Sequence, residues 1–297
     1  MNDIKLIPSV AEYSPDGLYR EAFFKFMNTP TPAAAKVTGT AAFSKFVHLL
    51  QIVSDNPEAL SVPELASLSG YPRPTVYRTV AGLVAEGLLV ESLRGGTYQL
   101  GPRLIQLASR SWGRSELRLA SVQALKDLRD ITSETVHLAV PNDKHMVYIE
   151  KLESPSAVRM DSYIGSNVSM HSSSVGKAYL AALTAAERDA VIRGLDFPQY
   201  TANTVSSAEH LYQQVEQIAQ QGWSVDDEEN ETGIYCFGAV IRGANDRPVA
   251  AISVSTLRFR QKSDPIEAYV EPLLAACQTI SRRIAQSPDS SGSDKIW

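Results

Sequence analysis

The 297-residue sequence is poor in cysteine and has no long apolar run. Only Cys236 and Cys277 occur, far apart in the chain, which is too few for a disulfide framework or a zinc site. No run of about 18 apolar residues is present, so an ordinary transmembrane helix is not expected. The first residues, MNDIKLIPSV, lack the basic and apolar regions of a secretion signal. These absences predict a cytoplasmic protein with reduced thiols and with no metal or other cofactor.

The chain also lacks an excess of positive charge. It has 28 Lys and Arg against 33 Asp and Glu, a formal net charge of -5. This balance counts against nucleic-acid binding as a property of the whole chain, although a local binding surface remains compatible with it. A hydrophobic content of 44% is ordinary for a globular protein, and the length predicts about two domains.

Changes in composition and pattern divide the chain into five segments. We expect an N-terminal extension at 1–40, a first domain at 41–101, a helical linker at 102–132, a second domain at 133–286 and a disordered tail at 287–297. The tail is rich in Ser and Asp, a composition that does not bury enough apolar surface to fold.

The stretch GYPRPTVYRTVAGLVAEGLLV, residues 70–90, contains two prolines that predict a helix start. Proline is tolerated in the first turn of a helix, where its missing N–H has no partner to lose, so we expect a helix from about Arg73 to Ala85. Apolar residues at helical spacing predict its buried stripe: Val76, Val80, Leu83 and Val84. The opposite face carries small and polar residues: Thr75, Arg78, Thr79 and Gly82, flanked by Arg73 and Tyr77.

The neighbouring segments predict the rest of a DNA-binding domain. A helix precedes a capping box at Ser61–Glu64, and a short helix then ends at Gly70. After the helix at 73–85, two short β runs flank Arg94-Gly95-Gly96, which indicates a hairpin. This order of elements is typical of a winged helix-turn-helix, whose second helix enters the major groove of DNA.

The second domain alternates β and α patterns. Strands are expected at 135–140, 146–151, 157–161, 223–227, 235–242 and 248–256. Helices are expected from Ser174, at 185–194, at 208–220 after a capping box from Ser206 to Glu209, and at 265–284. The linker before this domain is predicted to form two helices that break near Gly113, and it is rich in arginine.

These residues resemble the IclR family of bacterial transcriptional regulators over roughly residues 42–284. The resemblance rests on LSVPELASLSGYPRPTVYRTVAGLVAEGLL, YQLG, MHSSSVGKAYLA and GWSVDDEENETGIYCFGAVI followed by PVAAISVS. It implies an α+β plan with an N-terminal winged helix-turn-helix, a helical linker used in dimerisation, and a C-terminal GAF-like domain with an antiparallel sheet. In the family, the C-terminal domain binds a small effector.

The resemblance also implies two sets of site residues. The candidate DNA-binding residues are Arg73, Pro74, Thr75, Tyr77, Arg78 and Arg94. The candidate effector-binding residues are Met160, Val168, Ser174, Val175, Asp226, Ile234, Cys236, Ser253 and Ser255. Ser174 and Pro74 depart from the family pattern, since some relatives carry a smaller residue at the first position and most carry serine at the second. No catalytic or metal-binding residue is assigned.

The charge of the first domain opposes this interpretation. Residues 42–100 contain only Lys45, Arg73, Arg78 and Arg94 against five carboxylates. DNA binding would then depend on backbone N–H groups at helix starts, on hydroxyl groups and on the cationic linker. Few neutralised phosphates predict a shallow salt dependence for each head, and a dimer would compensate by doubling the contacts.

Several motifs leave an enzymatic alternative open. Ser174-x-x-Lys177 matches a serine–lysine nucleophile motif, and Cys236 is a second candidate nucleophile. A phosphate-binding loop is not matched, because Ala178 follows Lys177. A helix N-terminus that binds a carboxylate fits the 173–177 segment best. The four acids at 226–229 are interpreted as a solvated turn, with a pocket role for Asp226 alone.

The sequence therefore predicts a ligand-responsive DNA-binding transcriptional regulator. We expect a small carboxylate to bind between the helix start at 173–177 and Ser253 and Ser255, which lie on one face of a strand. The expected partners are operator DNA, the effector and further copies of the chain in a homodimer or homotetramer. A serine or cysteine hydrolase and a constitutive DNA-binding protein are the alternatives. Repressor and activator both stay open as the sign of regulation, because the family contains both.

Overall fold

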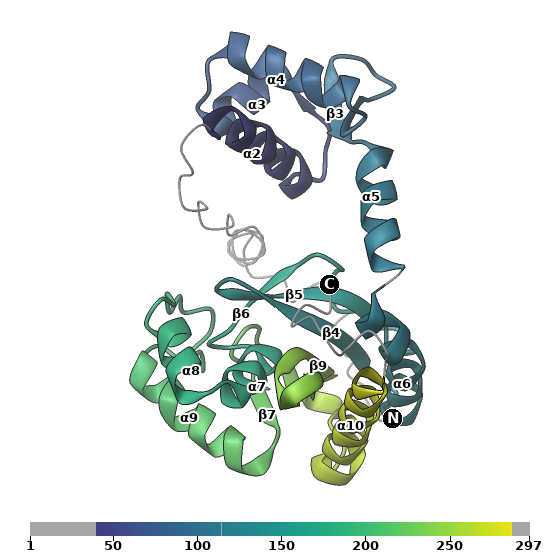
Figure 1. The fold of residues 1–297 in the computed structure, drawn as a ribbon, viewed down its shortest axis with the longest axis vertical. Coiled ribbons are helices and arrows are strands. Elements are labelled where there is room, and N and C mark those ends of the chain that lie inside the picture. Colours follow the sequence, from purple (N-terminus) through teal and green to yellow (C-terminus); the bar gives the residue numbers. More distant parts are fainter. Residues whose placement is uncertain (1–39, 114, 287–297) are drawn as a thin grey trace, which may run out of the picture. The chain divides into compact units, whose positions relative to one another are not determined.

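The computed structural model describes residues 40–113 and 115–286. The predicted N-terminal extension, apart from Thr40, and the predicted C-terminal tail lie outside these residues. The chain divides into two compact units with the boundary between Leu104 and Ile105. Each unit is described by itself, and Figure 1 labels the elements of both.

The first unit is a small helical domain with a three-stranded sheet. Its elements are α2 (Ala41–Asp55), β1 (Leu60–Ser61), α3 (Val62–Ser69), α4 (Arg73–Ala85), β2 (Leu89–Glu91) and β3 (Thr97–Leu100). The strands pair antiparallel in the order β1-β3-β2. One apolar cluster joins the three helices to the sheet, and its fully buried members include Leu49, Leu65 and Val76. This is the winged helix-turn-helix that the order of elements predicted.

Local sequence signals set the helix boundaries of this unit. The Oγ of Ser61 accepts the N–H of Glu64, and the Glu64 carboxylate accepts the Ser61 N–H at 2.7 Å, which completes the predicted capping box. Gly70 ends α3 with φ of 69°, a left-handed conformation that favours glycine. Pro72 is the N-cap of α4, which spans the predicted residues 73–85.

Two residues of α4 lie on the face opposite to the one expected. Thr79 is buried and donates its hydroxyl to the Thr75 carbonyl, whereas Val84 is exposed. Gly82 packs against α2, because a Cβ there would lie 3.0 Å from the ring of Phe46. The small side of α4 at Gly82 therefore serves helix packing inside the domain rather than the approach to another surface.

The linker forms two helices, as predicted, with a break at Gly113. These are α5 (Pro102–Trp112), which crosses the boundary between the units, and α6 (Glu116–Thr132). Ser115 caps α6 with its hydroxyl group, and Ser133 ends it in a left-handed conformation. Within the second unit α6 packs beside the last helix, α10 (Glu271–Ala285).

The second unit is built on a six-stranded antiparallel sheet in the order β6-β5-β4-β9-β8-β7. The strands are β4 (Thr135–Asn142), β5 (His145–Leu152), β6 (Asn167–Ser169), β7 (Ser224–Asp227), β8 (Ile234–Arg242) and β9 (Pro248–Leu257). The remaining helices are α7 (Ser174–Ala182), α8 (Ala185–Ile192) and α9 (Ala208–Gln221). Short 3-10 turns lie at Ala244–Asp246 and Arg258–Arg260, and a π-helical turn at Ile266–Val270 leads into α10.

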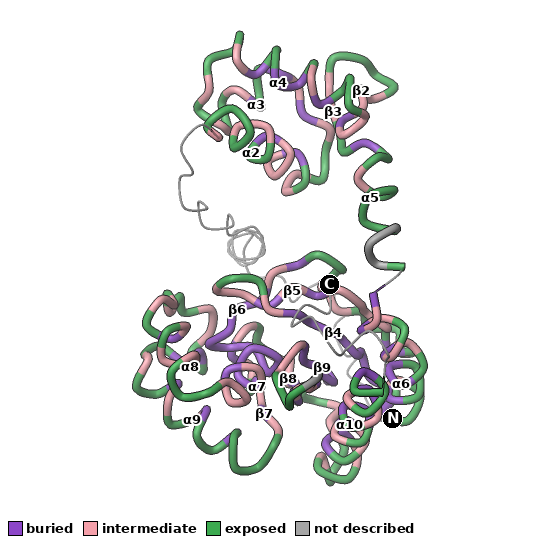
Figure 2. Tube along the Cα trace, viewed as in Figure 1, coloured by how far each residue is buried: buried purple, intermediate pink, exposed green. Residues whose placement is uncertain are grey.

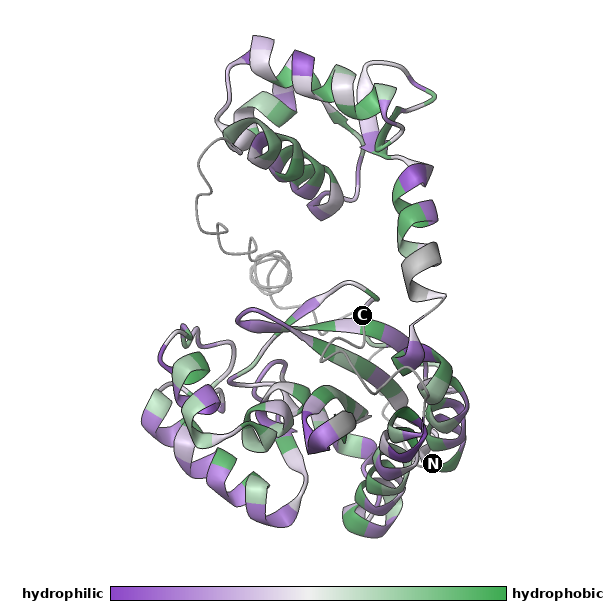
Figure 3. Ribbon diagram, in the orientation of Figure 1, coloured by the Kyte–Doolittle hydropathy of each residue, from purple (hydrophilic) through white to green (hydrophobic). Residues whose placement is uncertain are grey.

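Alternation along the strands gives this sheet two different faces. In β9, Ile252 and Val254 belong to a core shared with α6 and α10. Ala251 belongs to a second core shared with α7, α8 and α9. The result is a three-layer α+β domain with buried strands between helices (Figure 2). In Figure 3 the helices carry hydrophobic and hydrophilic residues side by side, as expected for amphipathic helices on a sheet.

The expected elements of this domain are corrected in two places. Residues 157–161 form no strand, because the amino group of Lys151 binds the carbonyls of Met160 and Ser162 and so replaces ladder hydrogen bonds there. The strand that pairs with β5 is instead β6, in which Ser169 lies opposite His145. Helix α9 is capped by Ser207 rather than by a capping box from Ser206.

Candidate functional site

The exposed face of α4 carries most of the candidate DNA-binding residues. Arg73, Pro74 and Arg78 are exposed, and the Tyr77 side chain is 60% exposed. Thr75 is half-buried and its carbonyl accepts the Thr79 hydroxyl. The sequence therefore places one aromatic and two guanidinium groups on the surface of the second helix of the motif.

Arg94 lies at the tip of the β2–β3 hairpin. Gly95 and Gly96 follow it with φ values of 73° and 72°, which only glycine adopts readily. The Gly95 N–H closes a turn on the Ser92 carbonyl, and the Glu91 carboxylate accepts the Gly96 N–H at 2.5 Å. Arg94 is thus presented to solvent on a hairpin whose tip is fixed by hydrogen bonds.

The acids and bases of this domain are engaged in different ways. Among the described residues, Arg73, Arg78 and Arg94 form no ion pair. Four of the five carboxylates have partners within the first unit: Asp55 with Gln51, Glu64 with Ser61, Glu86 with Arg103 of α5, and Glu91 with Gly96. Only Glu86 is paired with a cation, and the other three partners are uncharged groups that leave the carboxylate charge in place. What favours a polyanion is therefore the position of the three arginines on α4 and at the hairpin tip, and not the net charge of the domain.

In the second domain, the start of α7 lies directly on the sheet. A Cβ at Gly238 of β8 would lie 2.6 Å from the carbonyl of Ser174, so glycine permits this close approach. The Ser224 hydroxyl of β7 also donates to the Ser174 carbonyl at 2.6 Å. Ser173 caps the helix by accepting the N–H of Gly176. The register opposes Gly238 to Ser253, which brings the start of α7 next to the predicted serine row.

Ser253 and Ser255 share a buried histidine that the sequence analysis did not select. Their Oγ atoms each lie 3.4 Å from Nδ1 of His137, and Nε2 of His137 is 2.8 Å from the Ser162 hydroxyl. The His137 ring stacks on Tyr148 with centroids 4.3 Å apart. Burial, with the nearby Lys151 charge, lowers the pKa of His137 to about 3, so the imidazole is neutral near pH 7.

Cys236 and Asp226 extend this polar row toward the edge of the sheet. The register places Cys236 opposite Ser255 on one side and opposite Asp226 on the other. Burial, followed by the Asp226 charge, raises the pKa of the Cys236 thiol well above its usual value. A thiol held in its protonated form is a poor nucleophile. Cys236 therefore forms a neutral wall of this face.

The acidic run at 226–229 is not a solvated turn, contrary to the expectation from sequence. Asp226 is buried and accepts hydrogen bonds from the backbone of Glu229 and Asn230 and from the Asn230 side chain. Glu229 is also buried and pairs with Lys177. Burial raises the pKa of Asp226, and it raises the pKa of Glu229 to about 7. Only Asp227 of the run is exposed.

The Lys177 amino group is committed to this buried cluster. It donates to the Glu229 carboxylate and to Oε1 of Gln214 at 2.8 Å. A serine–lysine catalytic pair requires the amine to activate the serine hydroxyl. Lys177 is instead a cation paired inside the protein, and its partner Glu229 lies 52 positions along the chain.

The apolar candidates of the effector set lie around the same face. Val168 and Val175 are buried in the core shared by α7, α8 and α9. Ile234 begins β8 two residues before Cys236 and so lies on the same side of the strand. Met160 is half-buried in the loop whose carbonyls Lys151 binds. All nine candidates thus belong to one domain, and five of them, Asp226, Ile234, Cys236, Ser253 and Ser255, share one face of the sheet.

The residues that sequence reasoning missed are His137, Tyr148, Ser162 and Glu229. The alternation of TVHLAV places His137 on one side of its strand, but the identity of the neighbouring strand was not evident from the pattern.

Within residues 40–113 and 115–286, no cluster of His, Cys, Asp or Glu could hold a metal ion. None of the helices described is long and apolar enough to span a membrane.

Comparison with known protein families identifies both domains. Residues 43–92 match the IclR helix-turn-helix domain, and residues 110–282 match the family described as bacterial transcriptional regulator IclR C-terminal. The transcriptional repressor IclR of Escherichia coli strain K12 is 28% identical over 256 residues, which cover 85% of this chain and 93% of the repressor.

Solved structures show the same fold. The Thermotoga maritima IclR matches with a TM-score of 0.67 and 30% identity, covering 82% of this chain and 98% of that one. An IclR homolog from Microbacterium hydrocarbonoxydans, complexed with 4-hydroxybenzoate, matches with a TM-score of 0.73 and 22% identity. That match covers 82% of this chain and 99% of the homolog.

Proposed function

The chain belongs to the IclR family of bacterial transcriptional regulators, and from this premise we propose that it binds operator DNA under the control of a small carboxylate. The observation that carries the proposal is the juxtaposition of the α7 start with a buried hydroxyl row on one sheet face. A second, separate domain presents unpaired arginines on a winged helix-turn-helix. These are the two sites that a ligand-responsive regulator needs.

The proposed DNA contacts are made by α4 and the hairpin tip. Arg73 and Arg78 supply guanidinium groups suited to guanine or to phosphate, and Tyr77 supplies an exposed hydroxyl and ring. Pro74 and Thr75 lie in the first turn of α4, and we expect this turn to contact the DNA backbone beside the major groove. Arg94 at the wing would contact phosphate or the minor groove.

The proposed effector is held at the start of α7. The N-terminus of this helix favours an anion, and Ser174 and Val175 are its first residues. Ser253 and Ser255, with neutral His137 between them, offer hydroxyl and imidazole groups to the rest of the ligand. The 4-hydroxybenzoate complex of an IclR homolog supports a carboxylate in a protein of this fold.

The enzymatic alternative has less support. Lys177 is tied to Glu229 and Gln214, which removes the base from the proposed serine–lysine pair. Burial raises the pKa of Cys236, which removes thiolate character from the second nucleophile. The relatives are named as regulators, and their names include a repressor. An absence of turnover on ester and amide substrates is the expected outcome.

The mechanism we propose is linkage between the two sites. A ligand that prefers one arrangement of a dimer shifts its DNA affinity, and a coupling of about 1–3 kcal/mol gives a response of roughly 5–150-fold. A homodimer through head and linker, a homotetramer through the second domains and a cytoplasmic location beside the chromosome all remain predictions. Sedimentation of the full chain checks the first two.

Fluorescence anisotropy of the upstream intergenic DNA tests this function. We expect sequence-specific binding that one member of a carboxylate series shifts, and a Ser253→Ala/Ser255→Ala variant that binds DNA normally but loses the shift. Ser206→Ala, at an exposed serine outside the site, is the control. Binding no tighter than to random DNA at several salt concentrations would require a genome-wide selection, and failure there would contradict the proposal.

A further inference from the structure

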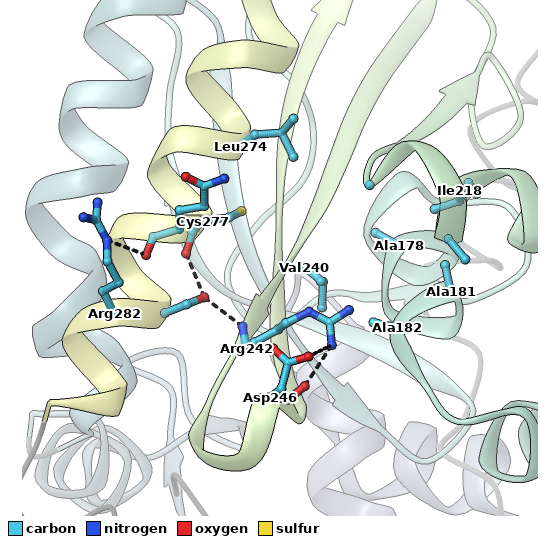
Figure 4. A pocket seen from close by; sticks show the side chains of 14 residues that line it. Ala178, Ala181, Ala182, Ile218, Val240, Arg242, Asp246, Leu274, Cys277 and Arg282 are labelled. Carbon is cyan, nitrogen blue, oxygen red and sulfur yellow. Dashed lines mark hydrogen bonds and ion pairs between the residues drawn. The ribbon is translucent and has the colours of Figure 1, made fainter.

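A cavity of about 590 Å³ lies in the second domain, and none of the predicted effector residues lines it. Figure 4 shows Leu274 and Cys277 of α10 on one side, alanines of α7 and Ile218 of α9 on the other, and Val240 between them. Small-molecule sites typically enclose about 300–1,000 Å³ and have mostly apolar walls with a few polar groups. The size and the walls of this cavity match that description.

The cavity lies beside the part of the β8 edge that β7 does not cover. Strand β7 pairs with β8 only as far as Gly238, so among the described residues no strand covers the β8 edge beyond that point. Helices from the two opposite faces of the sheet meet across this open edge, α7 and α9 from one and α10 from the other. The gap between them is therefore a consequence of a short edge strand.

One end of the cavity is cationic. Nη1 of Arg242 binds the carbonyl and, at 3.2 Å, the carboxylate of Asp246, whose side chain is 81% exposed. Both contacts use Nη1, so the guanidinium keeps further N–H donors. An exposed ion pair of this kind is worth only about 0–1 kcal/mol, and an incoming anion would replace Asp246 at little cost.

The other end is apolar and chemically inert. Ala178 and Cys277 are buried, and burial raises the pKa of the Cys277 thiol, which keeps it neutral. Ser281 is already satisfied, because it accepts the Arg242 N–H at 2.9 Å and donates to the Cys277 carbonyl. The other polar side chains of the lining are Gln278 and Arg282 of α10, and the Arg282 guanidinium bonds at 3.4 Å to the Gln278 carbonyl and to the Thr279 hydroxyl.

We propose that this cavity is a second small-molecule site, which binds an amphipathic anion with an apolar body and one acidic group. The apolar body lies against Leu274, Ile218 and the alanines of α7, and the acidic group pairs with Arg242. The site differs from the effector site in its lining, since none of the nine candidate effector residues lines the cavity; its nearest residue on α7, Ala178, is four residues from Ser174, about 6 Å along the helix axis. Both sites contact α7, so an occupant here adds a second input to the domain.

Fluorescence titration of the full chain with 8-anilinonaphthalene-1-sulfonate tests this site. N-phenyl-1-naphthylamine, the same apolar body without the sulfonate, is the matched uncharged probe. We expect Arg242→Gln to weaken binding of the sulfonate about tenfold and to leave the uncharged probe unchanged. Arg247→Gln, which removes an arginine of the neighbouring Glu187 ion pair and does not line the cavity, should change neither.

A second variant fills the cavity mouth. Ala219 lines the cavity on the exposed side of α9, and Gln220 beside it does not, so both accept phenylalanine without loss of the fold. Ala219→Phe should remove one sulfonate site per chain, and Gln220→Phe should retain it. Absence of saturable binding to the wild type, equal binding by wild type and Ala219→Phe, or equal loss in both phenylalanine variants would overturn the proposal.

Discussion

The head domain and the second domain place their charged groups in opposite ways. In the head, Arg73, Arg78 and Arg94 are exposed and form no ion pair among the described residues, while most carboxylates bond internally. In the second domain the notable charges, Lys177, Glu229 and Asp226, are buried and bonded to one another. The arginines of the head are therefore accessible to a charged partner, whereas the charged groups named in the second domain hold its interior together.

This difference explains why the net charge of the chain is a poor guide to its function. A charge that is satisfied inside a domain contributes little to the potential at a distant surface, whereas an unpaired arginine on a helix attracts a polyanion. Burial has the further consequence that the second domain holds groups with shifted pKa values. The described head residues include two carboxyl groups with shifted pKa values, Asp55 and Glu64.

The largest expected effect comes from breaking the buried pair. Lys177→Met leaves Glu229 buried without its cation, and at pH 8 we expect a loss of about 3–5 kcal/mol from the second domain. Urea unfolding followed by tryptophan fluorescence and circular dichroism measures it. Lys126→Met, at an exposed lysine of α6, is the control, and adding Glu229→Leu to Lys177→Met should restore much of the loss. An unchanged midpoint for Lys177→Met would mean that the pair is dispensable.

The next effect concerns the exposed charge of the head. Arg78→Ala should weaken specific DNA binding by about 1–3 kcal/mol, the usual worth of a bidentate base contact, and should leave the stability of the chain unchanged. Anisotropy at fixed salt concentration measures the affinity. Arg193→Ala, at an exposed position after α8, supplies the matched loss of charge outside the head. Equal losses in both variants would show a general electrostatic effect instead of a contact by α4.

A pH effect should arise from the buried histidine of the second domain. The folded-state pKa of His137 is about 3 against an ordinary 6.5, so between these values the unfolded chain binds a proton that the folded domain does not. Stability is therefore lost as the pH falls below 6.5. His137→Asn should reduce the slope of the free energy of unfolding against pH by about 1.4 kcal/mol per pH unit, as measured by urea unfolding from pH 7 to pH 4. His210→Asn, at an exposed histidine of α9, should retain the wild-type slope.

The smallest expected effect is the loss of stability on removing a helix cap, and the same capping motif occurs in both domains. Ser61 and Glu64 cap α3 in the head, and Thr184 and Glu187 cap α8 in the second domain. Replacing Ser61 or Thr184 by alanine should cost about 1 kcal/mol in each case, because one early N–H loses its acceptor. Thermal unfolding of the full chain, with hydrogen exchange to assign each loss to its domain, measures both. A loss of exchange protection in the other domain would contradict the assignment of each cap to the stability of its own unit.

Much of the head could be predicted because its signals are local. The prolines before α4, the Ser61–Glu64 box and the glycines of the wing each act within a few residues, and the structure places them as expected. Thr79 was assigned to the wrong face because its hydroxyl can bond the Thr75 carbonyl one turn earlier and so needs no solvent. That choice depends on what packs against α4, which the local pattern does not contain.

The sequence by itself determined the two domains, the helix starts and the family, since these depend on spacing, on caps and on motifs in order. Only the tertiary structure decided which polar groups meet. His137 reaches Ser253 and Ser255 across two neighbouring strands, and Lys177 reaches Glu229 from a helix over the sheet. These pairs are separated by more than 50 positions, and strand order sets their distance. Burial then shifted the pKa values, because desolvation depends on the neighbours that folding supplies.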